Sequence, residues 1–438
     1  MFALPAVKRF SLLLRRGLPS LRPGLRLYGA TYLVNGLGTG LFYPFSVLYF
    51  HQVVGFSFPI VGLGLTLATG VSLATVPTQG ALVDRFGART ILILACLLRA
   101  VGFLGYLLVH SFVAFVLLAA IVAIGTSTPA ASALVAEIVA PEERDRWIGL
   151  IRVLANAGLG AGGLLGGIAI ATVGTSGYRW LVVLNALSFA VAAVMLTRLK
   201  TPAESARIRA VPPGAATGDA GKSRATAGAA AGYVSVLRDR PFVVLVGVST
   251  LLWISNYSVD LALSPYVVSA LHAPTWIPGV LFALNTLLVV VAQVPIMGLL
   301  ASHRRTRAMM AGGLGYAVVF VYLALALLVP GTVLLPYLCA AVLLATTAEV
   351  VLAPSIVTLA TAVAPASLRG RYLALSSLSF SAAGAITPLL ATTLLAAGPA
   401  ALWLTLVPLM LVASAVVALL ERHLPPSALR APALVPSG

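Results

Sequence analysis

Three ionisable side chains, Arg99, Asp260 and Glu349, lie inside long apolar stretches of the sequence. An ionised side chain in hydrocarbon costs at least about 2.5 kcal/mol, so each of the three is a candidate functional residue. A carboxyl group held away from water can take up and release a proton, which is the chemistry of a proton-coupling site. We expect Asp260 and Glu349 to serve in such coupling. A structural, hydrogen-bonded carboxylate is the alternative at each position.

The composition indicates the environment that holds these groups. Of 438 residues, 60% are hydrophobic and 9% are charged, and the mean hydropathy is +1.04. Soluble domains carry about 25% charged residues, so we expect an integral membrane protein. The two cysteines, Cys96 and Cys339, both lie in apolar runs. Their placement excludes a disulfide framework and a cysteine-based metal site, and we expect neither a metal nor a cofactor.

Twelve stretches of the sequence have the roughly 20 apolar residues that a membrane-crossing helix needs. They cover residues 27–50, 58–79, 90–109, 113–138, 147–171, 178–197, 242–269, 276–299, 308–328, 332–362, 370–396 and 400–420. The pattern predicts an all-α membrane protein whose halves, 27–197 and 242–420, are joined by a flexible cytoplasmic linker at 198–241. Residues 1–26 are predicted to be a basic cytoplasmic arm rather than a cleaved signal peptide, and residues 421–438 a cytoplasmic tail.

Basic residues fall on one side of this topology. Of the 28 Lys and Arg residues, all but Arg99 and Arg179 lie in the arm, the linker, the tail or the loops on that same side. Positively charged loops remain in the cytoplasm, so both termini are expected there. The net charge of +17 is therefore a topology signal and not a nucleic-acid-binding surface. The preference for Arg over Lys favours a high-GC bacterial genome, and hence a bacterial cytoplasmic membrane.

The two sets of six spans share a pattern. Asn35 and Pro44 in the first span match Asn256 and Pro265 in the seventh at a constant separation. An even number of crossings in each unit makes the repeat parallel, which places a substrate site between the halves near the bilayer midplane. Pro44 and Pro265 would bend their helices at equivalent points.

The loop after the second span has the sequence GALVDRFGAR, which resembles the loop motif of the major facilitator superfamily. Its motif residues are Gly80, Asp84, Arg85, Gly87 and Arg89. The resemblance implies a cytoplasmic latch that holds one of two access states. Glu137 is expected to complement the latch arginines, with a solvated acidic cluster as the alternative. The copy in the second half has Ser302 in the position of Asp84, so only the first latch is complete.

Glycines in the fifth span resemble a motif of the antiporters and drug exporters of that superfamily. They are Gly149, Gly158, Gly162, Gly166 and Gly167, with Gly163 where the motif has proline. The resemblance implies export by antiport. A face of small residues that lets helices approach closely is the alternative.

The resemblance also implies a fold of twelve helices in two parallel six-helix repeats, with a cavity lined by the first, fourth, seventh and tenth helices. Asp260 and Glu349 then lie on cavity-forming helices. Further cavity candidates are Asn35, Tyr43, Trp253, Asn256, Tyr257 and Gln293. This set suits an amphipathic organic substrate, including a cation, although each residue has helix packing as its alternative. Arg99, on the peripheral third helix, is expected to pair with a neighbouring helix rather than to touch substrate.

These features predict a secondary transporter rather than an enzyme. We expect a monomer in the lipid bilayer that exports small amphipathic organic compounds in exchange for protons by rocker-switch alternating access. One alternative is a proton-coupled importer of metabolites or nutrients on the same fold. Others are a membrane sensor or assembly protein that transports nothing, and a membrane-embedded enzyme. The sequence has no ATP-binding P-loop, which argues against a primary pump in this chain.

Overall fold

The computed structural model describes residues 23–126, 128–199, 236–300, 303–365 and 368–429. These residues form helices and connecting turns, with no β-strand among them, as the sequence predicts. The predicted arm at 1–26, the linker at 198–241 and the tail at 421–438 lie largely outside the described residues.

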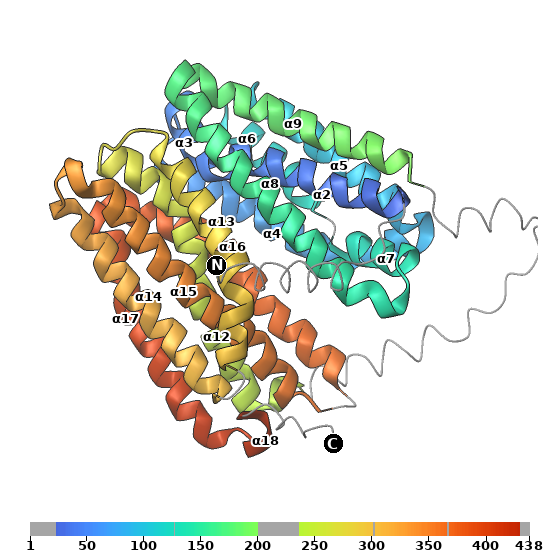
Figure 1. Cartoon of the computed structure of the whole chain (residues 1–438), viewed down its shortest axis with the longest axis vertical. Helices are drawn as coiled ribbons and strands as arrows, with labels where there is room; N and C mark the ends of the chain where they lie inside the picture. The colour runs from blue at the N-terminus through green and yellow to red at the C-terminus, as the bar shows by residue number, and fades with distance from the viewer. Residues whose placement is uncertain (1–22, 127, 200–235, 301–302, 366–367, 430–438) are drawn as a thin grey trace, which may run out of the picture.

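The described helices form two groups that lie side by side (Figure 1). The first group contains α2 (Pro23–Phe42), η1 (Tyr43–Phe45), α3 (Ser46–Leu48), η2 (Tyr49–Val53), α4 (Phe58–Phe86), α5 (Ala88–Tyr106), α6 (Phe112–Ile124), α7 (Thr128–Ile138), η3 (Pro141–Glu143), α8 (Arg144–Val173) and α9 (Thr175–Thr197). The second group contains α12 (Arg240–Pro265), η4 (Tyr266–Ala270), α13 (Ile277–Leu300), α14 (Arg305–Leu325), η5 (Ala326–Leu328), α15 (Gly331–Val363), α16 (Arg369–Ala397), α17 (Pro399–Leu420), η6 (Glu421–His423) and α18 (Pro426–Leu429). We call these groups the N half and the C half.

Each of the twelve predicted spans coincides with a helix or with consecutive helical segments. Within the described residues, eleven helical stretches are long and apolar enough to cross a membrane. The remaining predicted span, at 276–299, falls on α13, whose apolar stretch runs from Ile277 to Gln293. The fourth span is divided at Gly125, between α6 and α7.

The first and seventh spans show how the halves correspond. Both end in a π-helical segment, η2 and η4. The hydroxyl of Tyr49 in η2 donates to the carbonyl of Tyr106 at 2.8 Å, and that of Tyr266 in η4 donates to the carbonyl of Leu323 at 2.6 Å. Pro44 lies five residues before Tyr49, but Pro265 lies directly before Tyr266. The sequence pairing of Pro44 with Pro265 is thus displaced by about one helical turn from the structural register.

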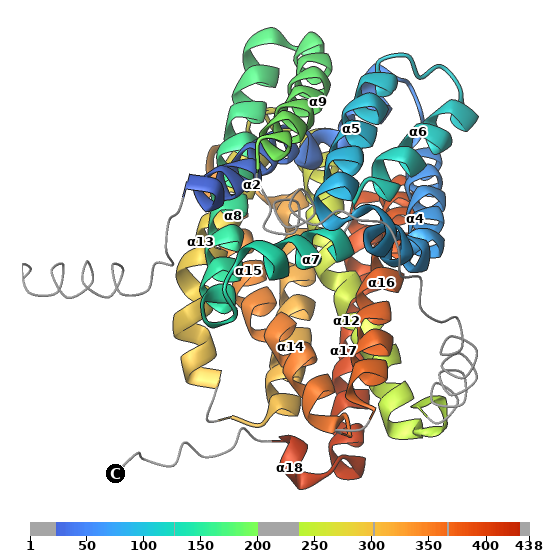
Figure 2. The ribbon, with the colours of Figure 1, turned by 90° about the vertical axis from the view of Figure 1, so that its right-hand side faces the viewer.

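Each half has its own hydrophobic core. In the N half the core surrounds Phe45, Phe115 and Trp147, and in the C half it surrounds Tyr266 and Trp403. Figure 2 shows the two bundles one above the other. Each bundle therefore buries apolar side chains of its own.

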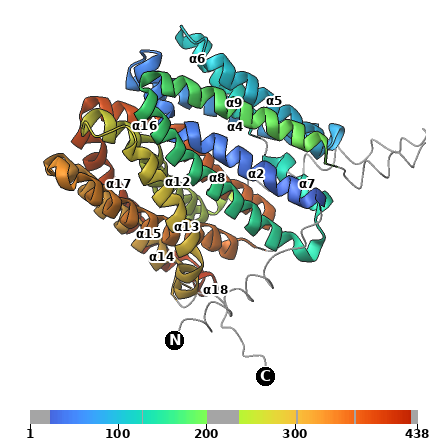
Figure 3. The ribbon, with the colours of Figure 1, turned by 45° about the horizontal axis from the view of Figure 1, so that its top comes forward.

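The halves contact each other mainly through two helix pairs, α4 with α16 and α8 with α13; η1 also contacts α12 and α13, and α3 contacts α12. Across the first pair, the backbone N–H of Leu389 donates to the Thr66 hydroxyl at 3.2 Å. These contacts lie in the parts of the helices remote from the described chain ends. Figures 1 and 3 show the helices of the two halves diverging toward α7 and α18. A Cβ added at Gly80 or Gly298, nearer this diverging end, would meet no described atom within 4 Å.

Candidate functional site

A cluster of polar side chains lies inside the C half. Helix α12 carries Asp260 and α15 carries Glu349, and the two carboxyl groups are close enough to interact electrostatically. The side-chain amide of Asn285, on α13, donates to Glu349 Oε2 at 3.4 Å and to the Thr346 hydroxyl at 2.9 Å. Four helices of one half therefore converge on these acids, because Tyr316 of α14 also lies beside both of them.

Asn256 belongs to the same cluster. It precedes Asp260 by four residues, so both side chains project from one face of α12. Its amide donates to the Tyr316 hydroxyl at 3.2 Å and lies beside the Glu349 carboxyl group. The structure thus brings together three residues that the sequence singled out, Asp260, Glu349 and Asn256. Sequence reasoning missed Asn285, Tyr316 and Thr346, of which only Asn285 carried a signal, as an amide in the middle of an apolar span.

Neither carboxyl group has a basic partner within the described residues. Arg304 and Glu421 form an ion pair at 2.5 Å, and neither residue belongs to this cluster. Asp260 lines a cavity of about 30 Å³ together with Asn285 and Phe282, which is room for a water molecule. The arrangement can hold a proton on either acid and exchange it with water, but it offers no permanent counter-ion.

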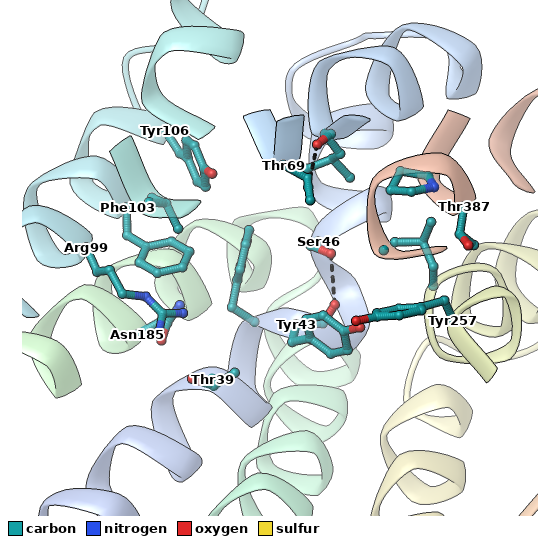
Figure 4. A pocket seen from close by; sticks show the side chains of 16 residues that line it. Thr39, Tyr43, Ser46, Thr69, Arg99, Phe103, Tyr106, Asn185, Tyr257 and Thr387 are labelled. Carbon is teal, nitrogen blue, oxygen red and sulfur yellow. Dashed lines mark hydrogen bonds between the residues drawn. The ribbon is translucent and has the colours of Figure 1, made fainter. Parts of the chain in front are cut away.

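A larger cavity of about 340 Å³ lies between the halves (Figure 4). Its N-half wall includes Tyr43, Arg99 and Asn185, and its C-half wall includes Tyr257 and Thr387. Figure 4 shows the rings of Tyr43 and Tyr257 lying next to each other from opposite halves. Tyr43 also interacts electrostatically with both Tyr257 and Asp260. The tyrosine pair therefore lies at the wall of this central cavity and near Asp260 of the acidic cluster.

The other predicted cavity residues lie in three different places. Trp253 packs edge-on against Phe380 of α16, with ring centroids 4.9 Å apart. Gln293 lies two turns beyond Asn285 along α13 and lines none of the cavities described. Asn35 lines a separate N-half cavity of about 240 Å³, and its Oδ1 is buried without a hydrogen-bond partner among the described residues. Asn35 and Asn256 thus occupy different environments, as the displaced register explains.

Arg99 lines both the central cavity and this N-half cavity. Its guanidinium carbon lies 4.1 Å from the centroid of the Phe189 ring and 5.9 Å from that of Phe103. Its Nε is buried and has no hydrogen-bond partner within the described part of the chain. The side chain thus packs on aromatic rings, and the pairing with a neighbouring helix that the sequence led us to expect is not an ion pair.

The loop motif joins α4 to α5 within the N half. Gly87 has φ +83°, which favours glycine, and it separates the two helices. Arg89 donates from Nε to the carbonyl of Leu196 at 2.9 Å, at the end of α9. Asp84 and Glu137 are both exposed, and neither forms an ion pair or hydrogen bond among the described residues. In this conformation the motif therefore contacts its own half: Arg89 lies at the C-terminus of α9, where a positive charge is stabilised by the helix dipole.

The glycine motif on α8 has two faces. A Cβ at Gly158 or Gly162 would overlap the backbone of α2. On the other face, a Cβ at Gly163 would lie 2.7 Å from Phe282 Cδ1, and one at Gly167 would lie 2.9 Å from the Trp276 carbonyl oxygen. Gly166 faces α2, whereas a Cβ at Gly149 would meet no described atom within 4 Å. These glycines allow close packing both within the N half and between the halves.

Comparison with known proteins gives the family. The model of the Major Facilitator Superfamily matches residues 29–278 and 245–436. Multidrug resistance protein MdtH of Aeromonas hydrophila is 33% identical over 132 residues, 30% of this chain and 33% of that protein. The MFS-type transporter YttB of Bacillus subtilis is 31% identical over 137 residues, 31% of this chain and 34% of that protein. The chain thus spans about a third of the length of these curated relatives.

Solved structures share the fold. A mutant of the nucleoside transporter NupG has a TM-score of 0.75 at 12% identity, over 91% of this chain and 99% of that one. A bacterial homologue of the human lysosomal transporter Spinster, inward-facing and unoccupied, has a TM-score of 0.71 at 15% identity, over 94% and 100%. The all-α fold predicted from sequence is confirmed, and the family whose model matches is one of transporters rather than of enzymes. The chain belongs to the major facilitator superfamily.

Proposed function

We propose that this chain exports small amphipathic organic compounds in exchange for protons. The observation that carries the proposal is the pairing of Asp260 with Glu349, without a basic partner among the described residues, beside a cavity between the halves. Two neighbouring carboxyl groups without a cation are stabilised when a proton is bound between them. A cluster of this kind can therefore carry a proton across when the cavity changes the side to which it opens.

The proposed site works by rocker-switch alternating access in a bacterial cytoplasmic membrane. With both termini in the cytoplasm, as the distribution of basic residues predicts, the diverging end of the helices faces inward. Substrate enters from the cytoplasm, and the halves then rotate as units about the α4–α16 and α8–α13 contacts. Opening to the outside would break the Leu389–Thr66 hydrogen bond and bring Asp84 and Glu137 into the predicted cytoplasmic latch. The protein acts as a monomer in this scheme, because the cavity is built from one chain.

Export as the direction is supported by two observations. The fifth-span glycines resemble the exporter motif, with Gly163 in place of its proline, and both Gly163 and the motif residue Gly167 pack against the other half. The relatives named multidrug resistance protein are similar to this chain over about a third of its length. Import of a metabolite on the same fold is the alternative, and direct transport measurements distinguish it from export.

Everted membrane vesicles with an imposed pH gradient test the proposal. A fluorescent amphipathic dye should accumulate when the vesicle interior is acidic, since protons leaving the lumen drive the dye inward. Asp260→Asn and Glu349→Gln should each weaken the dependence of the uptake rate on the gradient, and the double variant should remove it. Glu142→Gln, at an exposed acid remote from the cavity, serves as the matched control. Retention of the pH dependence in the double variant would contradict proton coupling. Accumulation in right-side-out vesicles under an acidic exterior, where antiport would expel the dye, would contradict export.

A further inference from the structure

Arg99 is a cation at the wall of the central cavity that has no anion beside it. Asp84 and Glu137, the acids on the neighbouring described helices of the N half, are exposed residues near the diverging end. In the C half, Asp260 and Glu349 do not line the central cavity. Arg99 is partly exposed, since it lines two cavities. A cation inside a membrane-spanning bundle without an anion is costly, which makes it a candidate binding residue for a ligand that supplies the missing charge.

The surrounding structure fixes this side chain in place. Gly125, at the break between α6 and α7, leaves room for it, because a Cβ there would lie 2.5 Å from Arg99 Cγ and 2.9 Å from the Ala95 carbonyl oxygen. On the other side the guanidinium stacks on Phe189, which is itself stacked on Phe103 with 10° between the ring planes. Since packing holds the guanidinium, its N–H groups remain available to a ligand.

Polar atoms beside Arg99 also lack partners. The Oδ1 atoms of Asn185 and Asn35 are buried without a hydrogen bond among the described residues. Asn185 lines the central cavity next to Arg99 (Figure 4), and Asn35 lines the N-half cavity on its other side. Both atoms are acceptors, so water or a hydrogen-bond donor on a ligand would satisfy them, while the N–H groups of Arg99 are left for an acceptor.

We propose that Arg99 binds an acidic group of the transported compound, which makes the cargo an amphipathic organic anion such as an aryl or alkyl carboxylate. The planar guanidinium matches a carboxylate in a bidentate manner. The apolar body of the compound would lie along Phe103, Tyr106 and Leu261, which line the same cavity of about 340 Å³, a volume suited to a small molecule. The inference rests on the proposed transport function and assigns cargo recognition to the N half, leaving the acids of the C half to the protons.

Equilibrium binding to the purified full-length protein tests this assignment. The probes are naphthalene compounds that share one ring system and carry a carboxylate, a carboxamide or a primary amine, and the readout is ligand-dependent thermal stabilisation. The carboxylate should bind more tightly than the amide and the amine. Arg99→Gln should weaken carboxylate binding about tenfold or more, as expected for lost charge-assisted hydrogen bonds, and should weaken amide binding much less, because the amide carries no charge. Arg99→Lys should bind the carboxylate with intermediate affinity.

Gly125→Ala keeps the charge but displaces the Arg99 side chain, so it should weaken carboxylate binding even if Arg99→Gln folds poorly. Glu142→Gln, at an exposed acid remote from the cavity, should leave carboxylate binding intact. The proposal would be overturned by preferential binding of the amine, by equal carboxylate binding in the wild type and Arg99→Gln, or by no carboxylate-specific stabilisation at millimolar concentration. Because these measurements need no proton gradient, their failure is distinguishable from a failure of proton coupling.

Discussion

Substitution of Gly167 by alanine should shift the balance between the two access states. The added Cβ would lie 2.9 Å from the carbonyl oxygen of Trp276, 3.2 Å from its Cα and 3.3 Å from Gly279 Cα. All three are backbone atoms that cannot rotate away, so the overlap costs about 1 to 3 kcal/mol in the conformation described. Separation of α8 from α13 around Gly167 removes that cost. The population of the state in which the two helices are apart there should therefore rise about 5- to 150-fold.

Two glycines on the same helix provide matched controls. Gly149→Ala meets no described atom within 4 Å, so it should gain helix propensity, about 1 kcal/mol, equally in both states. Gly158→Ala overlaps the carbonyl group of Leu33 inside the N half, and it should lower the unfolding temperature without favouring either access state. The three variants separate a shift in the conformational equilibrium from a general loss of stability.

Pulsed electron paramagnetic resonance measures the predicted shift. Spin labels at Ser176→Cys and Thr332→Cys, exposed positions in different halves, would report the separation of the halves at the end where they now touch. Cys96 and Cys339 would first be replaced. Gly167→Ala should add a population at longer distance, whereas Gly149→Ala should reproduce the parent distribution. An unchanged distribution in Gly167→Ala, or the same change in both variants, would refute the reasoning.

Two further predictions concern stability. Gly87→Ala places a side chain at φ +83° and should lower the free energy of unfolding by about 1 to 3 kcal/mol, seen as a lower unfolding temperature. Gly80→Ala, which has open space around its Cβ position, should show no such loss. Equal unfolding temperatures of the two variants would contradict backbone strain at Gly87. Glu421→Gln removes the ion pair with Arg304; the Glu421 side chain is 17% exposed and that of Arg304 is 35% exposed. The free energy of unfolding should fall by about 1 kcal/mol or less, and this loss should shrink as salt is raised. A loss that does not depend on salt would point to the hydrogen bond with Thr306 instead.

The sequence was sufficient for the architecture because the physical constraint is strong. An apolar run of membrane length has to be a helix, since hydrocarbon cannot satisfy exposed backbone groups. The same argument identified Asp260 and Glu349, because charged side chains inside such runs are costly. Their meeting in the structure follows from the packing of α12 against α15 in one half.

The remaining site residues could not be predicted from the sequence in the same way. Membrane helices are apolar on nearly all faces, so the pattern does not say that Asn285 of α13 points inward or that Tyr316 of α14 reaches the acids. The cavity role of Arg99 was missed because its helix was placed at the periphery by resemblance. The distribution of charges would have indicated this role of Arg99. The acids of the N half all lie toward one end of its helices, so none of them is placed to pair with Arg99.

The two tyrosine-to-carbonyl bonds each span 57 residues, so they give equivalent reference points in the two halves. Arg99 corresponds to Tyr316, because each precedes the acceptor residue of its half by the same number of residues. Tyr43 corresponds to Asp260 in the same way, counted from the donor tyrosine. The two halves therefore share this hydrogen bond but differ in the side chains at equivalent interior positions. The N half holds a cation and the C half an acid at these positions, so exchanging residues between the halves is a rational route to re-engineering this cavity.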